Sequence, residues 1–313
     1  MHRHSLSKTP EWDKRLQLRN SWPNFENDFL DNPKSAIRNP KFQPATAVHR
    51  FGFRWRARRE QKRLRRAGGV IEQALAEALA ATLRETQPDA ETATWMHRIE
   101  TLRTALLRSD AEVTFRDYGA EGRLKTSREP DAPFRETTRA VQTLGRDAVP
   151  PHEGRLLYHL IRQFKPTRCL ELGTSLGISA AYQAAALATV GKGGRLISLE
   201  GGAALARLAQ DHLDALDLPG VEVVTGPFAE TLPAVLQRHR PIEFAFIDGH
   251  HNPAAMQAYF AQLTPHLADE AVLVFDDIFW TTGMRHAWLA LAAGPHIRLA
   301  VDLLAVGICI FRV

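Results

Sequence analysis

The chain has 313 residues, of which 44% are hydrophobic and 24% charged, which allows one large core with an appendage or two domains. No apolar run approaches the ~20 residues of a membrane-spanning helix, and the start of the chain lacks the apolar segment of a secretory signal, so we expect a cytoplasmic protein. Cys169 and Cys309 fall in apolar runs, which favours buried, reduced thiols.

The net charge of +5 is unevenly distributed along the chain. Residues 1–69 hold 17 Lys and Arg against 6 Asp and Glu, whereas the remainder holds 23 against 29. Within this segment, residues 50–66 interleave nine basic residues with three aromatic ones. Such a pattern is typical of a disordered, solvated tail or of an arm that grips nucleic-acid phosphates, and a third interpretation places the true start of translation near Met96. We expect a disordered tail over residues 1–69, with nucleic-acid binding as the less favoured alternative.

Residues 70–150 are expected to form a helical extension and a linker. Apolar residues recur at helical spacing over 71–85 and 90–108, which predicts two amphipathic helices. Residues 109–150 form a mixed, polar stretch in which residues 113–119 are a candidate short strand.

From residue 151 onward the pattern alternates between strands and helices, which predicts a parallel sheet covered by helices on both faces. A helix over 154–164 comes first. Strands are expected at 167–172, 195–199, 221–224, 243–248 and 271–276, and the helices after them at 178–189, 203–216, 228–238, 254–267 and 282–293. The last two strands, 296–303 and 306–312, are joined too tightly for a helical crossover, so they must be antiparallel.

The turn after the first of these strands is the most informative motif. Its spacing is Glu171-x-Gly173-x-x-x-Gly177, which differs from the G-x-G-x-x-G turn of dinucleotide-binding proteins. A carboxylate just before the turn would repel a pyrophosphate, but it suits a ligand that carries positive charge. The glycines would then allow the backbone to approach that ligand closely.

The stretch Leu170-Glu-Leu-Gly-Thr-Ser-Leu-Gly-Ile-Ser179 resembles the first motif of class I S-adenosylmethionine-dependent methyltransferases, and most of all bacterial O-methyltransferases related to the catechol and caffeoyl types. The resemblance implies an α/β fold with a doubly wound, mostly parallel seven-stranded Rossmann-like sheet that a C-terminal antiparallel hairpin closes. The resemblance also implies that residues 151–313 form the cofactor-binding domain. It implies that the methyl group is transferred to a hydroxyl oxygen of a small molecule. The implied cofactor is S-adenosyl-L-methionine, and its implied binding residues are Glu171, Gly173, Thr174, Gly177, Glu200, Gly201 and Asp248.

Acidic residues follow three of the predicted strands, where ligands of open α/β sheets bind. Glu200 ends the second strand, and in the resembling family the acid at this position accepts the ribose hydroxyls. Asp248 ends the fourth strand, and Asp276 and Asp277 end the fifth. The family places Asp, Asp and Asn at the strand ends that bind a divalent cation such as Mg²⁺, and here Asp277 stands where the Asn would be. Alternatively, Asp248 contacts cofactor or substrate while Asp277 caps the following segment.

Methyl transfer to an oxygen requires removal of the acceptor's proton. Asp248, His250 and His251 are the candidate bases if no metal takes part. Two further hypotheses stay open: an RNA methyltransferase that captures its substrate through residues 50–66, and a nucleoside-binding module without catalytic activity. Homodimerisation also stays open.

Overall fold

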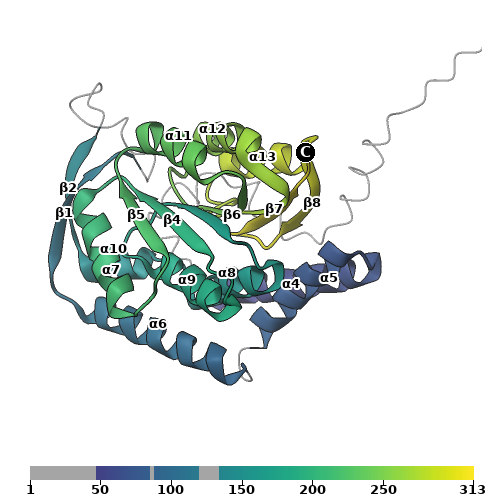
Figure 1. The fold of residues 1–313 in the computed structure, drawn as a ribbon, viewed down its shortest axis with the longest axis horizontal. Coiled ribbons are helices and arrows are strands. Elements are labelled where there is room, and N and C mark those ends of the chain that lie inside the picture. The colour runs from purple at the N-terminus through teal and green to yellow at the C-terminus, as the bar shows by residue number, and fades with distance from the viewer. Residues whose placement is uncertain (1–46, 85–87, 120–133) are drawn as a thin grey trace, which may run out of the picture. The chain divides into compact units, whose positions relative to one another are not determined.

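The computed structural model describes residues 47–84, 88–119 and 134–313. Its central element is a seven-stranded sheet with the strand order β5-β4-β3-β6-β7-β9-β8 (Figure 1). The strands are β3 (Arg168–Leu172), β4 (Arg195–Glu200), β5 (Val221–Thr225), β6 (Ile242–Ile247), β7 (Leu267–Phe275), β8 (Ile297–Asp302) and β9 (Gly307–Phe311).

The strand pairing confirms the predicted topology. The strands from β5 to β7 pair in parallel, while β9 is antiparallel to both β7 and β8. β6 lies beside β7, as expected, so the residues that follow these two strands share one edge of the sheet. The chain reverses its direction along the sheet next to β3, and this is where ligands bind in open α/β folds.

Helices cover both faces of the sheet, and each face has its own core. Successive residues of β6 show the division, because Phe244 and Phe246 belong to one apolar cluster, whereas Ala245 and Ile247 belong to the other. The helices of this domain are α8 (Pro151–Phe164), α9 (Ile178–Val190), α10 (Ala203–Ala215), α11 (Phe228–His239), α12 (Pro253–Leu263) and α13 (Thr282–Ala292), with a short 3₁₀ turn η2 (Thr264–His266).

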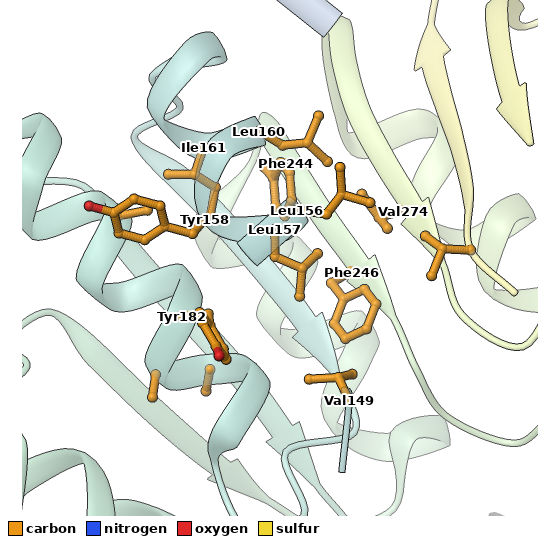
Figure 2. Close-up of a cluster of buried hydrophobic side chains, with 14 of the residues drawn as sticks. Val149, Leu156, Leu157, Tyr158, Leu160, Ile161, Tyr182, Phe244, Phe246 and Val274 are labelled. Carbon is orange, nitrogen blue, oxygen red and sulfur yellow. The ribbon is translucent and has the colours of Figure 1, made fainter. Parts of the chain in front are cut away.

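Helix α8 contributes several large side chains to the first of these cores. Figure 2 shows Leu156, Leu157 and Leu160 of α8 facing Phe244 and Phe246 of the sheet. The helix begins after Pro150 with Pro151 in its first turn, a position where the missing N–H costs no helical hydrogen bond. The helix start therefore has a fixed place above the sheet.

The N-terminal extension differs from the expected disordered tail. Helix α4 (Ala47–Ala67) lies within it, and Phe53, Ala57 and Leu64 on one side of this helix are almost completely buried. The segment contains few apolar residues and many arginines, so its average composition predicts a solvated tail. The apolar residues nevertheless lie on one face of the helix, and that face is packed. Residues 1–46 of the expected tail lie outside the described residues.

The rest of the extension follows the prediction more closely. Helices α5 (Val70–Leu83) and α6 (Ala90–Arg108) match the two expected amphipathic helices. The linker holds the expected strand, β1 (Glu112–Asp117), and two elements that the sequence analysis missed: strand β2 (Arg135–Ala140), antiparallel to β1, and helix α7 (Val141–Asp147). None of the described helices combines the length and apolarity needed to cross a membrane.

Candidate active site at the carboxyl edge of the sheet

The turn after β3 depends on a glycine for its close contact with β6. Gly173 has a φ of +103°, and a Cβ atom added to it would lie 2.1 Å from the carbonyl oxygen of Asp248. The N–H of Gly173 donates to the carbonyl of Leu199 in β4. The turn is therefore attached to both neighbouring strands, and no larger residue fits there.

Gly177 allows close packing between helices, and its expected contact with the ligand stays a prediction. Its φ is +82°, and an added Cβ would lie 3.3 Å from Ala209 of α10. The glycine thus allows the start of α9 to pack closely against α10.

Glu171 lies beneath the turn, fully buried, with Ser198 Oγ and Gln183 Nε2 donating to its carboxylate. Burial raises the pKa of Glu171 to about 7, although the hydrogen bond from Ser198 opposes this rise. Thr174 Oγ1 lies 2.6 Å from Ser198 Oγ and extends the same network. These contacts show that Glu171 organises the turn, and its predicted contact with the cofactor stays a prediction.

Glu200 lies at the end of β4, beside the turn, and only 9% of it is exposed. Its two carboxylate oxygens accept hydrogen bonds from the backbone N–H groups of Ser175 and Gly202, each at 2.8 Å. Burial raises the pKa of Glu200, and the bond from Gly202 opposes this rise. Each oxygen retains a second lone pair, so the carboxylate is fixed in place and can still accept from a ligand hydroxyl.

A cavity of about 1060 Å³ opens at the ends of β4 and β5. Gly201 lies in its wall, and a Cβ added there would lie 2.7 Å from the ring of Tyr118, which follows β1. The β1–β2 pair thus forms one side of the cavity. The residues that line it include Phe115, Tyr118, Gly201, Thr225, Phe228 and Tyr259.

His250 connects this cavity wall to the end of β6. Its Nε2 lies 2.8 Å from the carbonyl oxygen of Tyr118, and its Nδ1 contacts the hydroxyl of Tyr259. A neutral ring that donates from Nε2 and accepts at Nδ1 satisfies both contacts. These contacts give His250 a structural role in joining the cavity wall to the loop after β6, and its predicted role as a base stays a prediction.

Three carboxylates meet where β6 and β7 end. Asp276 Oδ1 accepts from the N–H of Asp277 at 2.8 Å. Burial raises the pKa of both groups to about 7, and for Asp276 the charge of Asp277 adds to the effect. The pKa of Asp248 is raised by burial and then by Asp276 and Asp277. Three acidic side chains therefore lie close together at this edge of the sheet, and burial and their proximity favour their protonated forms.

His251 lies between two of these carboxylates. Its Nδ1 is 3.3 Å from Asp277 Oδ2, and its Nε2 is 3.8 Å from Asp248 Oδ1. The exposed ring of Trp280 lies 6.1 Å from the imidazole, centroid to centroid. Of the three predicted bases, His251 and Asp248 thus lie together, and His250 is held elsewhere.

A second polar group nearby was missed by the sequence analysis. His49 of α4 and His152 and Glu153 of α8 are all buried, and one ligand atom of each lies within 4.8 Å of the others. The adjacent His and Glu at the start of an otherwise apolar helix were a visible signal. No signal marked His49, because its segment was expected to be disordered.

Comparison with protein families gives one match, to the family described as "Methyltransferase domain", over residues 170–278. A catechol O-methyltransferase from Niastella koreensis is 34% identical over 108 residues, which are 34% of this chain and 48% of that protein. The chain thus spans about half the length of this curated relative.

Solved structures with a similar fold include two O-methyltransferases. The O-methyltransferase from Bacillus cereus, in complex with SAH, covers 77% of this chain and 99% of its own, at 19% identity and a TM-score of 0.48. The O-methyltransferase TomG from Streptomyces achromogenes, in complex with SAM, covers 53% of this chain and 82% of its own, at 24% identity and a TM-score of 0.46.

Proposed function

We propose that this chain, whose residues 170–278 match a methyltransferase domain, is an S-adenosyl-L-methionine-dependent O-methyltransferase that acts on a hydroxyl group of a small molecule. The observation that carries the proposal is the acidic carboxyl edge of the sheet, where Glu200 is fixed beside a glycine turn and the wall of a nucleoside-sized cavity. The resemblance of the curated relative supports the same reaction class. Neither an RNA substrate nor a purely non-catalytic role finds support in these comparisons.

The residues in the cavity wall and directly beside it fit the cofactor in chemistry. Glu200 retains lone pairs for the ribose hydroxyls, and Phe228 supplies an apolar ring for the adenine. The absence of a side chain at Gly201 admits the ring of Tyr118, which lies in the cavity wall. Asp248 lies at the junction with the acidic edge, where a positively charged group gains from nearby carboxylates.

The bound cofactor would supply an electrophilic methyl group, and the chain must position the acceptor and remove its proton. His251 is the residue we assign to that proton. Asp277 lies 3.3 Å from its Nδ1 and is placed to orient the ring. Asp248 lies 3.8 Å from its Nε2, outside hydrogen-bond distance, so we assign the proton to Nε2 and expect both carboxylates to stabilise the imidazolium that forms. Trp280 is placed to contact an aromatic acceptor from the solvent side.

The first test is calorimetry with S-adenosylmethionine and S-adenosylhomocysteine, followed by transfer of labelled methyl groups to catechol as the probe acceptor. We expect binding of both nucleosides at one site per chain and label in the methylated product. Absence of nucleoside binding would refute the proposal outright. Binding without transfer to catechol or to any hydroxyl compound of a cell extract would favour the non-catalytic module instead.

The second test separates catalysis from binding. The His251→Gln variant should lose at least about 100-fold in kcat while its affinity for S-adenosylhomocysteine stays unchanged, because only proton removal is affected. His286→Gln, on α13, is the matched control and should retain full activity. Equal kcat values in the two variants would exclude His251 as the base.

A further inference from the structure

We propose that His49, His152 and Glu153 form a binding site for a divalent transition-metal cation of the Zn²⁺ class, which joins helix α4 to helix α8. The site goes beyond the proposed methyl transfer, because its residues belong to neither the cavity nor the strand ends. It rests on a juxtaposition of side chains from two helices that are separated by about a hundred residues of sequence.

The geometry of the three ligand atoms carries the inference. Glu153 Oε1 lies 4.0 Å from His49 Nδ1 and 3.7 Å from His152 Nε2, and all three atoms lie within 4.8 Å of one another. Ligand atoms about 2.0–2.1 Å from a tetrahedral metal are separated by roughly 3.4 Å. A contraction of a few tenths of an ångström to at most about 1.4 Å would therefore bring all three into coordination distance.

The burial of the three side chains indicates a specific binding site rather than a chance grouping of polar residues. His49, His152 and Glu153 are 6%, 4% and 3% exposed. Glu153 Oε1 is buried and accepts no hydrogen bond from any of the described residues. Burying a carboxylate without a donor is costly, and coordination of a cation removes that cost.

The surrounding charge also favours a cation. Asp276 and Asp277 are near enough for their negative charges to act on Glu153. The ring of Phe53 lies 4.7 Å from the ring of His152, edge to face, so the imidazole is held between an aromatic side chain and the carboxylate. A divalent cation would neutralise repulsion that the three acidic residues otherwise share.

The donor set selects the class of metal. Two imidazole nitrogens and one carboxylate suit Zn²⁺, Co²⁺ or Fe²⁺, whereas Mg²⁺ and Ca²⁺ prefer oxygen ligands. Three ligands from the described residues are one short of the four in a closed structural zinc site. This set is thus chemically distinct from the all-carboxylate set, Asp248, Asp276 and Asp277, that the sequence predicts for Mg²⁺.

The test uses the full chain after treatment with a chelator. We expect one Zn²⁺ per chain by elemental analysis after equilibrium dialysis, and the visible bands of nitrogen-coordinated Co²⁺ when that ion replaces Zn²⁺. Uptake should persist in a large excess of Mg²⁺. Absence of stoichiometric Zn²⁺ or Co²⁺ binding would overturn the proposal.

Variants locate the metal. His152→Gln and Glu153→Gln should each weaken Zn²⁺ binding at least about 100-fold, because each removes one of three ligands. His159→Gln is the matched control, since His159 is buried in the same helix but outside the cluster, and it should bind Zn²⁺ as the unmodified chain does. Loss of Zn²⁺ in Asp248→Asn with retention in His152→Gln would place the metal at the strand ends and refute the site.

Two features keep the test decisive. If a variant fails to fold, the Co²⁺ spectrum of the unmodified chain still reports whether nitrogen ligands are present. Binding of S-adenosylhomocysteine is measured on the same samples, so failure of the metal site and failure of the proposed methyl transfer give different results.

Discussion

Glu200 is the side chain on which the cofactor proposal depends most directly. In Glu200→Gln, one of the two oxygens that accept from Ser175 and Gly202 becomes an amide nitrogen, and the negative charge is lost. We expect the affinity for S-adenosylhomocysteine to fall by about 10–100-fold, as for loss of a charged hydrogen-bond acceptor. Calorimetry measures this change.

The matched control for this variant is Glu222→Gln, on the exposed side of the neighbouring strand β5. It should leave the affinity unchanged. Equal affinities in the two variants would remove Glu200 from the binding site.

Gly173 is the residue whose replacement should disturb the site most through the backbone alone. In Gly173→Ala, the new methyl group would meet the Asp248 carbonyl at 2.1 Å in a left-handed conformation. We expect a loss of at least about 3 kcal/mol in the free energy of unfolding, because strain and steric overlap add. Urea denaturation provides the measurement.

The variant Gly191→Ala separates backbone strain from steric overlap as causes of the loss of stability. Gly191 also has a positive φ, of +69°, but an added Cβ has nothing within 4 Å. It should therefore cost only about 1 kcal/mol, the penalty of the left-handed conformation itself. Similar losses at both glycines would show that contact with Asp248 has no energetic effect.

A half-buried carboxylate helps to attach helix α4 to the sheet, beside the hydrogen bond that Arg63 donates to the carbonyl of Ala300. Asp302, at the end of β8, accepts from Arg56 of α4 at 2.6 Å, and from Arg285 and the indole of Trp288 of α13. Although burial opposes ionisation, the charges of Arg285 and Arg56 lower the pKa of Asp302 below its ordinary value. Three elements thus meet at a single acidic side chain.

Asp302→Asn should destabilise the chain by about 3 kcal/mol, because two largely buried guanidinium groups lose the negative charge between them. The exposed pair of Arg298 and Glu270 is the control, and Glu270→Gln should cost less than about 1 kcal/mol. Both values come from denaturant unfolding at neutral pH. A loss at Asp302 no greater than that at Glu270 would contradict this account of how α4 is held.

The sequence predicts some elements well and others poorly for a common physical reason. Helix α6 coincides with its expected bounds, because its apolar face repeats at helical spacing. Strand β2, with the sequence Arg-Glu-Thr-Thr-Arg-Ala, shows no such signal, since it is largely exposed and is stabilised by pairing with β1. Periodicity reveals elements that pack against a core and misses those that pack mainly against each other.

Similar reasoning applies to the site. The positions of Glu200, Asp248 and Asp276 could be predicted because each ends or directly follows a strand that the pattern identifies. The structural role of His250 could not be predicted, because the residue contacts Tyr118 and Tyr259, and Tyr118 lies far from it in the sequence. The same holds for His49, whose neighbours come from α8.

The buried carboxylate of Glu171 should make the stability of the whole chain depend on pH. Its pKa is raised from 4.5 to about 7 in the folded state, so folding favours the protonated form. The stabilising contribution is therefore complete below pH 4.5 and is lost as the pH rises through about 7. The loss across this window amounts to about 3 kcal/mol, following the size of the shift.

Glu171→Gln should remove this dependence, because the amide stays neutral and can still accept from Gln183. Urea unfolding at several pH values between 4.5 and 8 gives the difference in stability between variant and unmodified chain, which should grow with pH in the variant's favour. Glu222→Gln should show a constant difference. A constant difference for Glu171→Gln as well would mean that this carboxyl titrates alike in the folded and unfolded states.

The contacts of His250 have a mechanical consequence. One imidazole joins the outlying ribbon of β1 and β2, through Tyr118, to helix α12, through Tyr259, and its own backbone continues from Asp248. A ligand that enters the cavity and displaces the β1–β2 pair would therefore also displace the loop that carries Asp248 and His251. The imidazole of His250 thus couples the filling of the cavity to the positions of Asp248, Asp276 and Asp277.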